Sequence, residues 1–267
     1  MSESDRTSTP APSPGGVRVE IDTGVAVVTI DRPEVRNAIG AATVAELGAA
    51  LDQVLDSGAA VLVIRGGGDR AFVSGGDLKE LSAIRTHEAA VAMAGEVRRV
   101  LDRVAAFPVP VIAALNGHAL GGGAEVAIAA DVRIAADDIK IGFNQVTLGI
   151  MPAWGGAERL AQTVGRGRAL LTIATGDLLD ASTALRWGLV DIVVPRAEFD
   201  DEWRALAQRL AASAPGTTRA VKAVIAAAFP SVHPELEADA IEAFAGLWTA
   251  DAHWAAVEAL EQKRRGG

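Results

Sequence analysis

A glutamate stands behind a glycine triplet in a strongly apolar stretch of the chain. Residues 109–115 form an unbroken apolar run, residues 121–123 are glycines, and Glu125 precedes five apolar residues. The run predicts a strand buried on both faces, and the glycines predict a turn into a helix that opens at about Gly122. A carboxylate on a helix without a polar face is expected to be desolvated, which raises its pKa and suits it to proton transfer. Alternatively, Glu125 only complements the dipole of the helix start, and the local sequence leaves both interpretations open.

The order of strand, glycine-rich turn and helix start occurs twice. Residues 61–81 repeat, faintly, the pattern of residues 110–130. Each copy would leave a backbone N–H without an internal acceptor, one near Gly76 and one near Gly122. Two such donors that converge on one oxygen atom form an oxyanion hole, although the repeat does not show that they converge.

Several other chemistries are excluded or disfavoured. Residues 66–71 follow a strand and formally fit a dinucleotide-binding fingerprint, but Phe72 and Val73 continue as an extended segment where that motif requires a helix. We therefore expect no nucleotide cofactor. The chain has no cysteine and only four scattered histidines, so we expect no disulfide, cysteine nucleophile or metal site. His118, next to the glycine triplet, is interpreted as structural.

Composition limits the class of protein further. Half of the 267 residues are hydrophobic, yet no apolar run is long enough for a membrane span. The formal charge of −9 argues against a general nucleic-acid surface. Residues 1–16 are polar, rich in Ser, Pro and Thr, and lack the features of a signal peptide, so they predict a disordered N-terminal segment. A cytoplasmic protein is expected.

The expected elements alternate between strands and helices. A hairpin is predicted over 17–30, helices over 41–55 and 86–106, and helical structure from 199 to 265 with breaks at Pro215, Pro230 and Pro234. The other strands are predicted over residues 61–64, 71–73, 109–115, 132–134, 139–143 and 190–194.

Three ordered blocks resemble the signature of the enoyl-CoA hydratase/isomerase (crotonase) family. They are AFVSGGDLKEL at 71–81, NGHALGGGAE at 116–125 and LGIMPAWGG at 148–156. The likeness extends to DRPEVRNA at 31–38 and, weakly, to the last helix, so it covers about residues 17 to 265.

The resemblance implies an α/β fold, a crotonase-like spiral of ββα units over residues 17–198. It also implies a C-terminal helical region over residues 199–267 that assembles a homotrimer, often as a dimer of trimers. The expected partner is an acyl-CoA thioester. Because coenzyme A is carried by that substrate, no separate cofactor is expected.

The resemblance also implies roles for single residues. The thioester carbonyl would accept hydrogen bonds from the N–H groups of Gly76 and Gly122, and the catalytic positions are Glu125 and Gln145. The substrate-binding positions are Arg36, Ser74, Asp77, Leu78, Trp154 and Lys263. Arg36 matches a basic position near the CoA phosphates. Lys263 matches a lysine that can reach CoA bound to a neighbouring subunit, although its alternative is a solvated helix end.

One departure from the family pattern bears on the reaction. Hydratases of the family carry two catalytic glutamates; Glu125 matches the first, but the second position is Gln145. Glutamine can orient a water molecule but cannot accept its proton. Together with Asn144 and Trp154, it resembles the acyl-CoA decarboxylase branch, in which loss of carbon dioxide makes the enolate. We therefore expect an enoyl-CoA hydratase-type enzyme, with decarboxylation (of an ethylmalonyl-CoA or methylmalonyl-CoA type), isomerisation or non-catalytic acyl-CoA binding as alternatives.

Overall fold

The computed structural model describes residues 15–228 and 234–265. Most of the predicted disordered segment, residues 1–14, lies outside this range, as does Pro230. At the start of the described chain, the N–H of Gly15 donates a hydrogen bond to Glu46 Oε1 in the helix of residues 41–57, at 2.7 Å.

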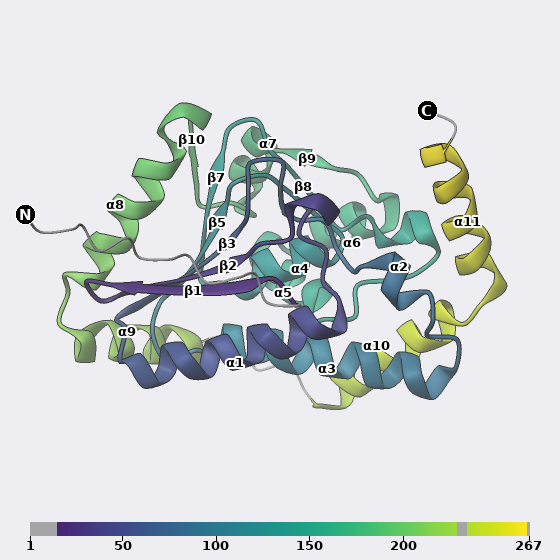
Figure 1. The fold of residues 1–267 in the computed structure, drawn as a ribbon, viewed down its shortest axis with the longest axis horizontal. Coiled ribbons are helices and arrows are strands. Elements are labelled where there is room, and N and C mark those ends of the chain that lie inside the picture. Colours follow the sequence, from purple (N-terminus) through teal and green to yellow (C-terminus); the bar gives the residue numbers. More distant parts are fainter. Residues whose placement is uncertain (1–14, 229–233, 266–267) are drawn as a thin grey trace, which may run out of the picture.

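Two sheets form the framework (Figure 1). The larger sheet contains, in spatial order, β1 (Val17–Asp22), β2 (Val25–Ile30), β3 (Val61–Gly66), β5 (Val111–Leu115), β7 (Val132–Ala136) and β10 (Ile192–Val194). The smaller sheet contains β4 (Ala71–Val73), β6 (His118–Leu120), β8 (Lys140–Gly142) and β9 (Leu179–Asp180). Pairing is parallel except for the hairpin β1–β2 and the edge pair β8–β9.

The sheets arise from a repeated path of the chain. In each of the pairs β3–β4, β5–β6 and β7–β8, the first strand joins the large sheet and the second joins the small sheet. A helix follows each pair, so each ββα unit adds one strand to each of the two sheets. The predicted spiral is confirmed. The sequence repeat did not reveal β6, because its three residues lie between Gly117 and Gly121 and have no alternating pattern.

Helices cover the sheets and supply one face of the site. They are α1 (Ala41–Ser57), α2 (Leu78–Leu81), α3 (His87–Ala105), α4 (Gly122–Ala129), α5 (Gly156–Val164), α6 (Arg166–Thr175), α7 (Ala181–Trp187), α8 (Phe199–Ala211), α9 (Pro215–Ala227), α10 (Pro234–Trp248) and α11 (Asp251–Arg265). Short 3₁₀ helices are η1 (Pro33–Val35), η2 (Asn144–Leu148) and η3 (Arg196–Glu198). In Figure 1, α10 lies along α3, and α11 stands at the C-terminal end of the molecule. Pro215 and Pro234 each begin a helix. A backbone N–H at that position has no acceptor within the helix, so the N–H that proline lacks breaks no hydrogen bond there.

The core explains why α4 lies where it does. Strand β5 is buried along its whole length, as its apolar run predicts. Helix α4 is buried on all sides and packs against the end of β4. A Cβ on Gly123 would lie 1.8 Å from the carbonyl oxygen of Val73, so only glycine allows this approach.

Some predicted boundaries shift by one or two residues for local reasons. Strand β5 begins at Val111 rather than 109, because Pro110 has no N–H to donate to the ladder. Strand β10 begins at Ile192 because Val190 donates its N–H to Ala184 in α7 instead. Helix α3 begins at His87. None of the helices in the described ranges is long and apolar enough to cross a bilayer.

Candidate active site

The side chain of Glu125 lies in the first turn of α4 and is 2% exposed. Its Oε2 accepts hydrogen bonds from the backbone N–H groups of Trp154, at 2.8 Å, and Gly156, at 2.9 Å. Its Oε1 accepts one from Gln145 Nε2 at 2.9 Å. All these donors are neutral, and the described chain provides no ion pair to this carboxylate. The interpretation of Glu125 as a helix-start residue alone does not explain these contacts, which come from outside α4.

Burial decides the protonation behaviour of this carboxylate. Desolvation raises the pKa of Glu125 from 4.5 to about 7, although the N–H groups of Gly156 and Trp154 act in the opposite direction. Charges on α5 contribute less: Glu158 raises this pKa and Arg159 lowers it. A carboxyl group with a pKa near neutrality can both accept and release a proton.

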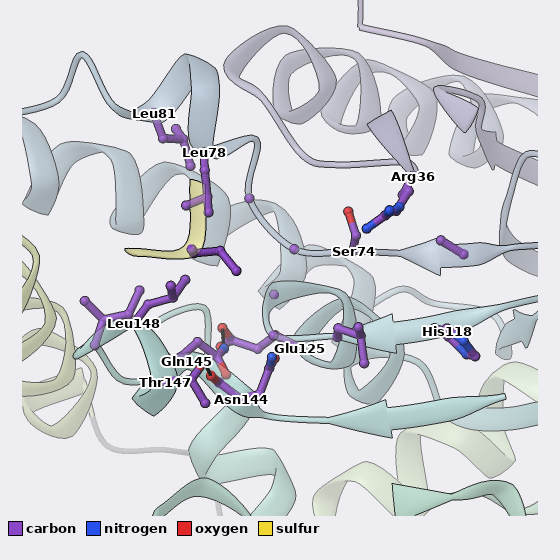
Figure 2. A pocket seen from close by; sticks show the side chains of 18 of the residues that line it. Arg36, Ser74, Leu78, Leu81, His118, Glu125, Asn144, Gln145, Thr147 and Leu148 are labelled. Carbon is purple, nitrogen blue, oxygen red and sulfur yellow. Dashed lines mark hydrogen bonds between the residues drawn. The ribbon is translucent and has the colours of Figure 1, made fainter. Parts of the chain in front are cut away.

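Gln145 lies beside Glu125 on the 3₁₀ helix η2 and is 8% exposed (Figure 2). While its Nε2 donates to Glu125, its Oε1 is buried and accepts no hydrogen bond from any described residue. Buried acceptors normally have a donor. The amide of Gln145 thus offers one acceptor beside the carboxyl group.

The two glycine turns each contribute one residue, with its backbone N–H, to the lining of the cavity. Within the described residues, neither the N–H of Gly76 nor that of Gly122 has an acceptor. The turns approach closely, since a Cβ on Gly75 would lie 3.3 Å from Leu120 O and 3.5 Å from Gly122 N. The N–H of Gly122 also lies at the positive end of the α4 dipole.

The indole of Trp154 packs against both glycine turns. A Cβ on Gly122 would lie 2.1 Å from Trp154 Cζ3, and one on Gly76 would lie 3.8 Å from Cη2. The indole N–H has no acceptor in the described part of the chain, and the side chain is 6% exposed. Trp154 thus belongs to the hydrophobic core and also forms a wall of the cavity.

A cavity of about 890 Å³ surrounds these groups. In Figure 2, Glu125 and Gln145 lie near its middle, with apolar side chains toward one end and polar side chains toward the other. The apolar end includes Leu78, Leu81 and Leu148, and the polar end includes Arg36, Ser74 and His118.

Comparison with known proteins identifies the family. Residues 20–262 match the family model described as enoyl-CoA hydratase/isomerase. A probable enoyl-CoA hydratase of Bacillus subtilis is 38% identical over 203 residues, covering 75% of this chain and 78% of that protein. A crotonyl-CoA hydratase of Syntrophomonas wolfei is 40% identical over 196 residues, covering 72% and 74%. The crystal structure of a carnitinyl-CoA hydratase from Mycobacterium avium superposes with a TM-score of 0.81 at 33% identity, covering 94% of this chain and 97% of that one.

The chain belongs to the enoyl-CoA hydratase/isomerase family. The predicted family is therefore confirmed, together with the predicted class, an acyl-CoA enzyme of the hydratase type.

The cavity brings together nine of the ten site residues predicted from the sequence: Arg36, Ser74, Gly76, Leu78, Gly122, Glu125, Gln145, Trp154 and Lys263. Asp77 is the exception. It pairs with Arg32 at 2.9 Å and accepts a hydrogen bond from the N–H of Glu80 at the start of α2, so its contacts are structural. His118 lines the cavity, and its Nδ1 accepts a hydrogen bond from the N–H of Lys140 at 3.0 Å, consistent with its structural interpretation.

In this enoyl-CoA hydratase/isomerase family member, the C-terminal helices line the chain's own cavity. Phe244 and Trp248 of α10 and Leu260 of α11 contribute apolar side chains, and Lys263 lines the same cavity. The resemblance had related Lys263 to CoA on a neighbouring subunit. Sequence reasoning missed the apolar residues, because amphipathic helices give no sign of which surface they cover.

The two backbone donors to Glu125 were also missed. They lie in the turn 154–156, where Gly155 has a φ of +86°. The pair Gly155-Gly156 ends the third motif block, and it indicates a tight turn without revealing which group the turn holds.

Proposed function

We propose that this enzyme adds water to the double bond of a 2-enoyl-CoA thioester. The thioester carbonyl oxygen accepts hydrogen bonds from the N–H groups of Gly76 and Gly122. This oxygen carries the negative charge of the enolate, and two preorganised donors in a buried site stabilise such a charge by several kcal/mol.

Glu125 serves as both base and acid in this proposal. Its carboxylate accepts a proton from water while the water oxygen bonds to C3, and the electrons of the C2–C3 double bond move toward the thioester to form the enolate. Glu125 then returns the proton to C2, so that the hydroxyl group and the proton of one water molecule are both added. A pKa of about 7 supports this double role, because neither protonation state is strongly disfavoured at neutral pH.

Gln145 holds the water in this proposal. Its Oε1, the buried acceptor without a partner in the described chain, accepts a hydrogen bond from the water, while Nε2 orients Glu125. The substrate supplies coenzyme A, with its charged part toward Arg36 and Lys263, and no further cofactor takes part.

The buried Glu125 with only neutral donors carries the proposal, and its pH dependence provides the test. Hydration needs the ionised carboxylate, so kcat/KM for crotonyl-CoA should rise with pH through about 7. Loss of the enoyl chromophore measures this rate. A flat profile across that interval in active enzyme would contradict Glu125 as the base.

Decarboxylation of a 2-carboxyacyl-CoA is the second candidate, favoured by the single carboxyl group beside the amide of Gln145. Here the bond from C2 to the carboxylate breaks, carbon dioxide leaves, and Glu125 as an acid protonates the enolate at C2. Protonated Glu125 would not repel the substrate's carboxylate, so kcat/KM for ethylmalonyl-CoA should fall above pH 7.

Replacing Gln145 separates the two candidates. Gln145→Glu supplies a second acid–base group, so crotonyl-CoA hydration should increase at least about tenfold. Turnover of ethylmalonyl-CoA should decrease, because a second carboxylate repels the substrate. If the substitution changes neither activity, the argument from a single carboxyl group is wrong.

The assembly proposed is a cytoplasmic homotrimer or a dimer of trimers. Exposed apolar side chains on α6 and α9 support it, among them Leu170, 64% exposed, and Val224, 71% exposed. Sedimentation equilibrium should yield three or six times the chain mass of 27.4 kDa. A monomer would contradict this proposal.

A further inference from the structure

A charged cluster lies behind the turn that holds Glu125. The turn 154–156 leads into α5, and a Cβ on Gly156 would lie 2.4 Å from Glu125 Cγ, so carboxyl group and turn are in tight contact. The next charged residues of α5 are Glu158 and Arg159. Both contact α3, a helix distant in sequence.

Arg159 holds the turn from its carbonyl side. Its Nη1 donates to the carbonyl oxygen of Trp154 at 3.0 Å, and its Nη2 donates to Asp102 on α3. The same Trp154 peptide segment presents its N–H to Glu125 at 2.8 Å. The guanidinium therefore restrains the residue that orients the carboxyl group.

Glu158 is restrained by an arginine that is almost fully buried. Arg98 of α3 is 2% exposed, and its Nη1 donates to Glu158 Oε1 at 2.7 Å. Arg98 Nε lies 3.6 Å from Asp102 and 3.5 Å from Glu237 on α10. Among the described residues, Glu158 Oε2 is buried and has no hydrogen-bond partner, so this carboxylate is only partly compensated.

The elements around Glu125 carry few other charges. Strands β4 and β5, which pack against α4, contain no ionisable side chain, and β6 contains only His118, which is exposed. The charged groups of the cluster are Glu158 and Arg159 on α5, Arg98 and Asp102 on α3, and Glu237 on α10.

We propose that Arg159 is a positioning residue that holds the turn 154–156 against Glu125, and that Arg159 and Glu158, which follow this turn on α5, set with opposite signs the ease with which Glu125 ionises. Glu158 disfavours the ionised carboxylate by repulsion, and Arg159 favours it by attraction. The opposite directions in which Glu158 and Arg159 shift the pKa of Glu125 agree with this geometry. The contact of Arg98 with Glu237 joins the pair to α10, which lines the apolar end of the cavity.

The test measures ionisation without turnover. In protein labelled with ¹³C at glutamate carboxyl groups, the Glu125 resonance is assigned by its loss in Glu125→Gln and titrated in the free enzyme. Glu158→Gln, which preserves shape, should lower the pKa of Glu125, and Arg159→Gln should raise it, each changing the ionisation constant at least about twofold. Asp52→Asn, at an exposed pair with Arg103, is the charge-matched control for Glu158→Gln and should leave the pKa of Glu125 unchanged.

A second variant and a kinetic readout separate charge from structure. Arg159→Lys keeps the charge but loses the planar fork, so the pKa of Glu125 should stay near the wild-type value while kcat decreases. This inference rests on Glu125 as the acid–base group of the proposed function. Shifts of equal sign in Glu158→Gln and Arg159→Gln, or no shifts, would overturn the inference. Intact shifts in a protein that turns over no thioester would instead contradict the proposed function.

Discussion

Asp77 and Glu125 are the first acidic residues after the two glycine turns of the repeat, and their environments differ. Asp77 pairs with the guanidinium of Arg32 at 2.9 Å and lies outside the cavity lining. Glu125 lies within the cavity lining, is 2% exposed and is held by neutral donors alone. The ion pair of Asp77 stabilises its turn, whereas burial among neutral donors raises the pKa of Glu125, which suits this carboxyl group to proton transfer.

The helices after the two turns cause this difference. Helix α2 is a single turn that buries Leu81 but exposes Lys79 and Glu80, so Asp77 at its start remains only half-buried. Helix α4 is completely buried, and it carries Glu125 into the interior with it. The first turn is therefore suited to positioning a substrate, and the second to carrying out proton transfer.

The largest expected effect is on proton transfer at the second turn. Glu125→Gln keeps the shape and most hydrogen bonds but removes the base, so kcat for hydration should fall by roughly 10²–10⁴. Steady-state kinetics with crotonyl-CoA measure the loss. Full activity of the variant on every thioester tested would make Glu125 a structural residue like Asp77.

The next effect tests the N–H of the second turn. Gly122→Pro removes this donor at the first helical position, where proline is tolerated, but the ring would collide with Trp154. We therefore compare Gly122→Pro with Gly122→Ala, both in a Trp154→Ala background. The proline variant should have kcat/KM lower by roughly 10²–10³ than the alanine variant, which keeps the N–H. Equal turnover of the two would contradict the oxyanion hole.

A third prediction concerns the contribution of Glu125 to the free energy of unfolding. The folded-state pKa of Glu125, about 7, lies above the ordinary value of 4.5, so its contribution to stability is complete below pH 4.5 and is lost as pH rises through about 7. The loss should be about 3 kcal/mol in the free energy of unfolding, relative to Glu125→Gln. Denaturant titrations across this pH interval measure it. A constant difference between the two proteins would contradict the raised pKa.

The smallest effect is expected at the first turn. Asp77→Asn weakens the pair with Arg32, which should cost about 1–2 kcal/mol, between the values for exposed and buried pairs. Because Asp77 does not line the cavity, kcat should remain close to the wild-type value. Thermal unfolding measures the loss of stability, and steady-state kinetics on the same preparation measure kcat. A large decrease in kcat with unchanged stability would show that Asp77 acts on substrate.

The sequence by itself determined most of the strands and helices, and the family. The apolar run that ends at Leu115 predicted the buried strand β5, and the three motif blocks identified the family and the positions of Glu125 and Gln145. These are local signals, because a strand or a glycine turn depends mainly on residues close in sequence.

Only the tertiary structure decided which distant groups meet. The backbone donors to Glu125 come from residues 29 and 31 positions later, Arg98 reaches Glu158 across 60 positions, and the C-terminal helices line the cavity. The raised pKa of Glu125 and the structural role of Asp77 follow from these contacts. Desolvation and charge pairing depend on the groups that surround a side chain in space. Residues adjacent in the sequence supply few of these groups.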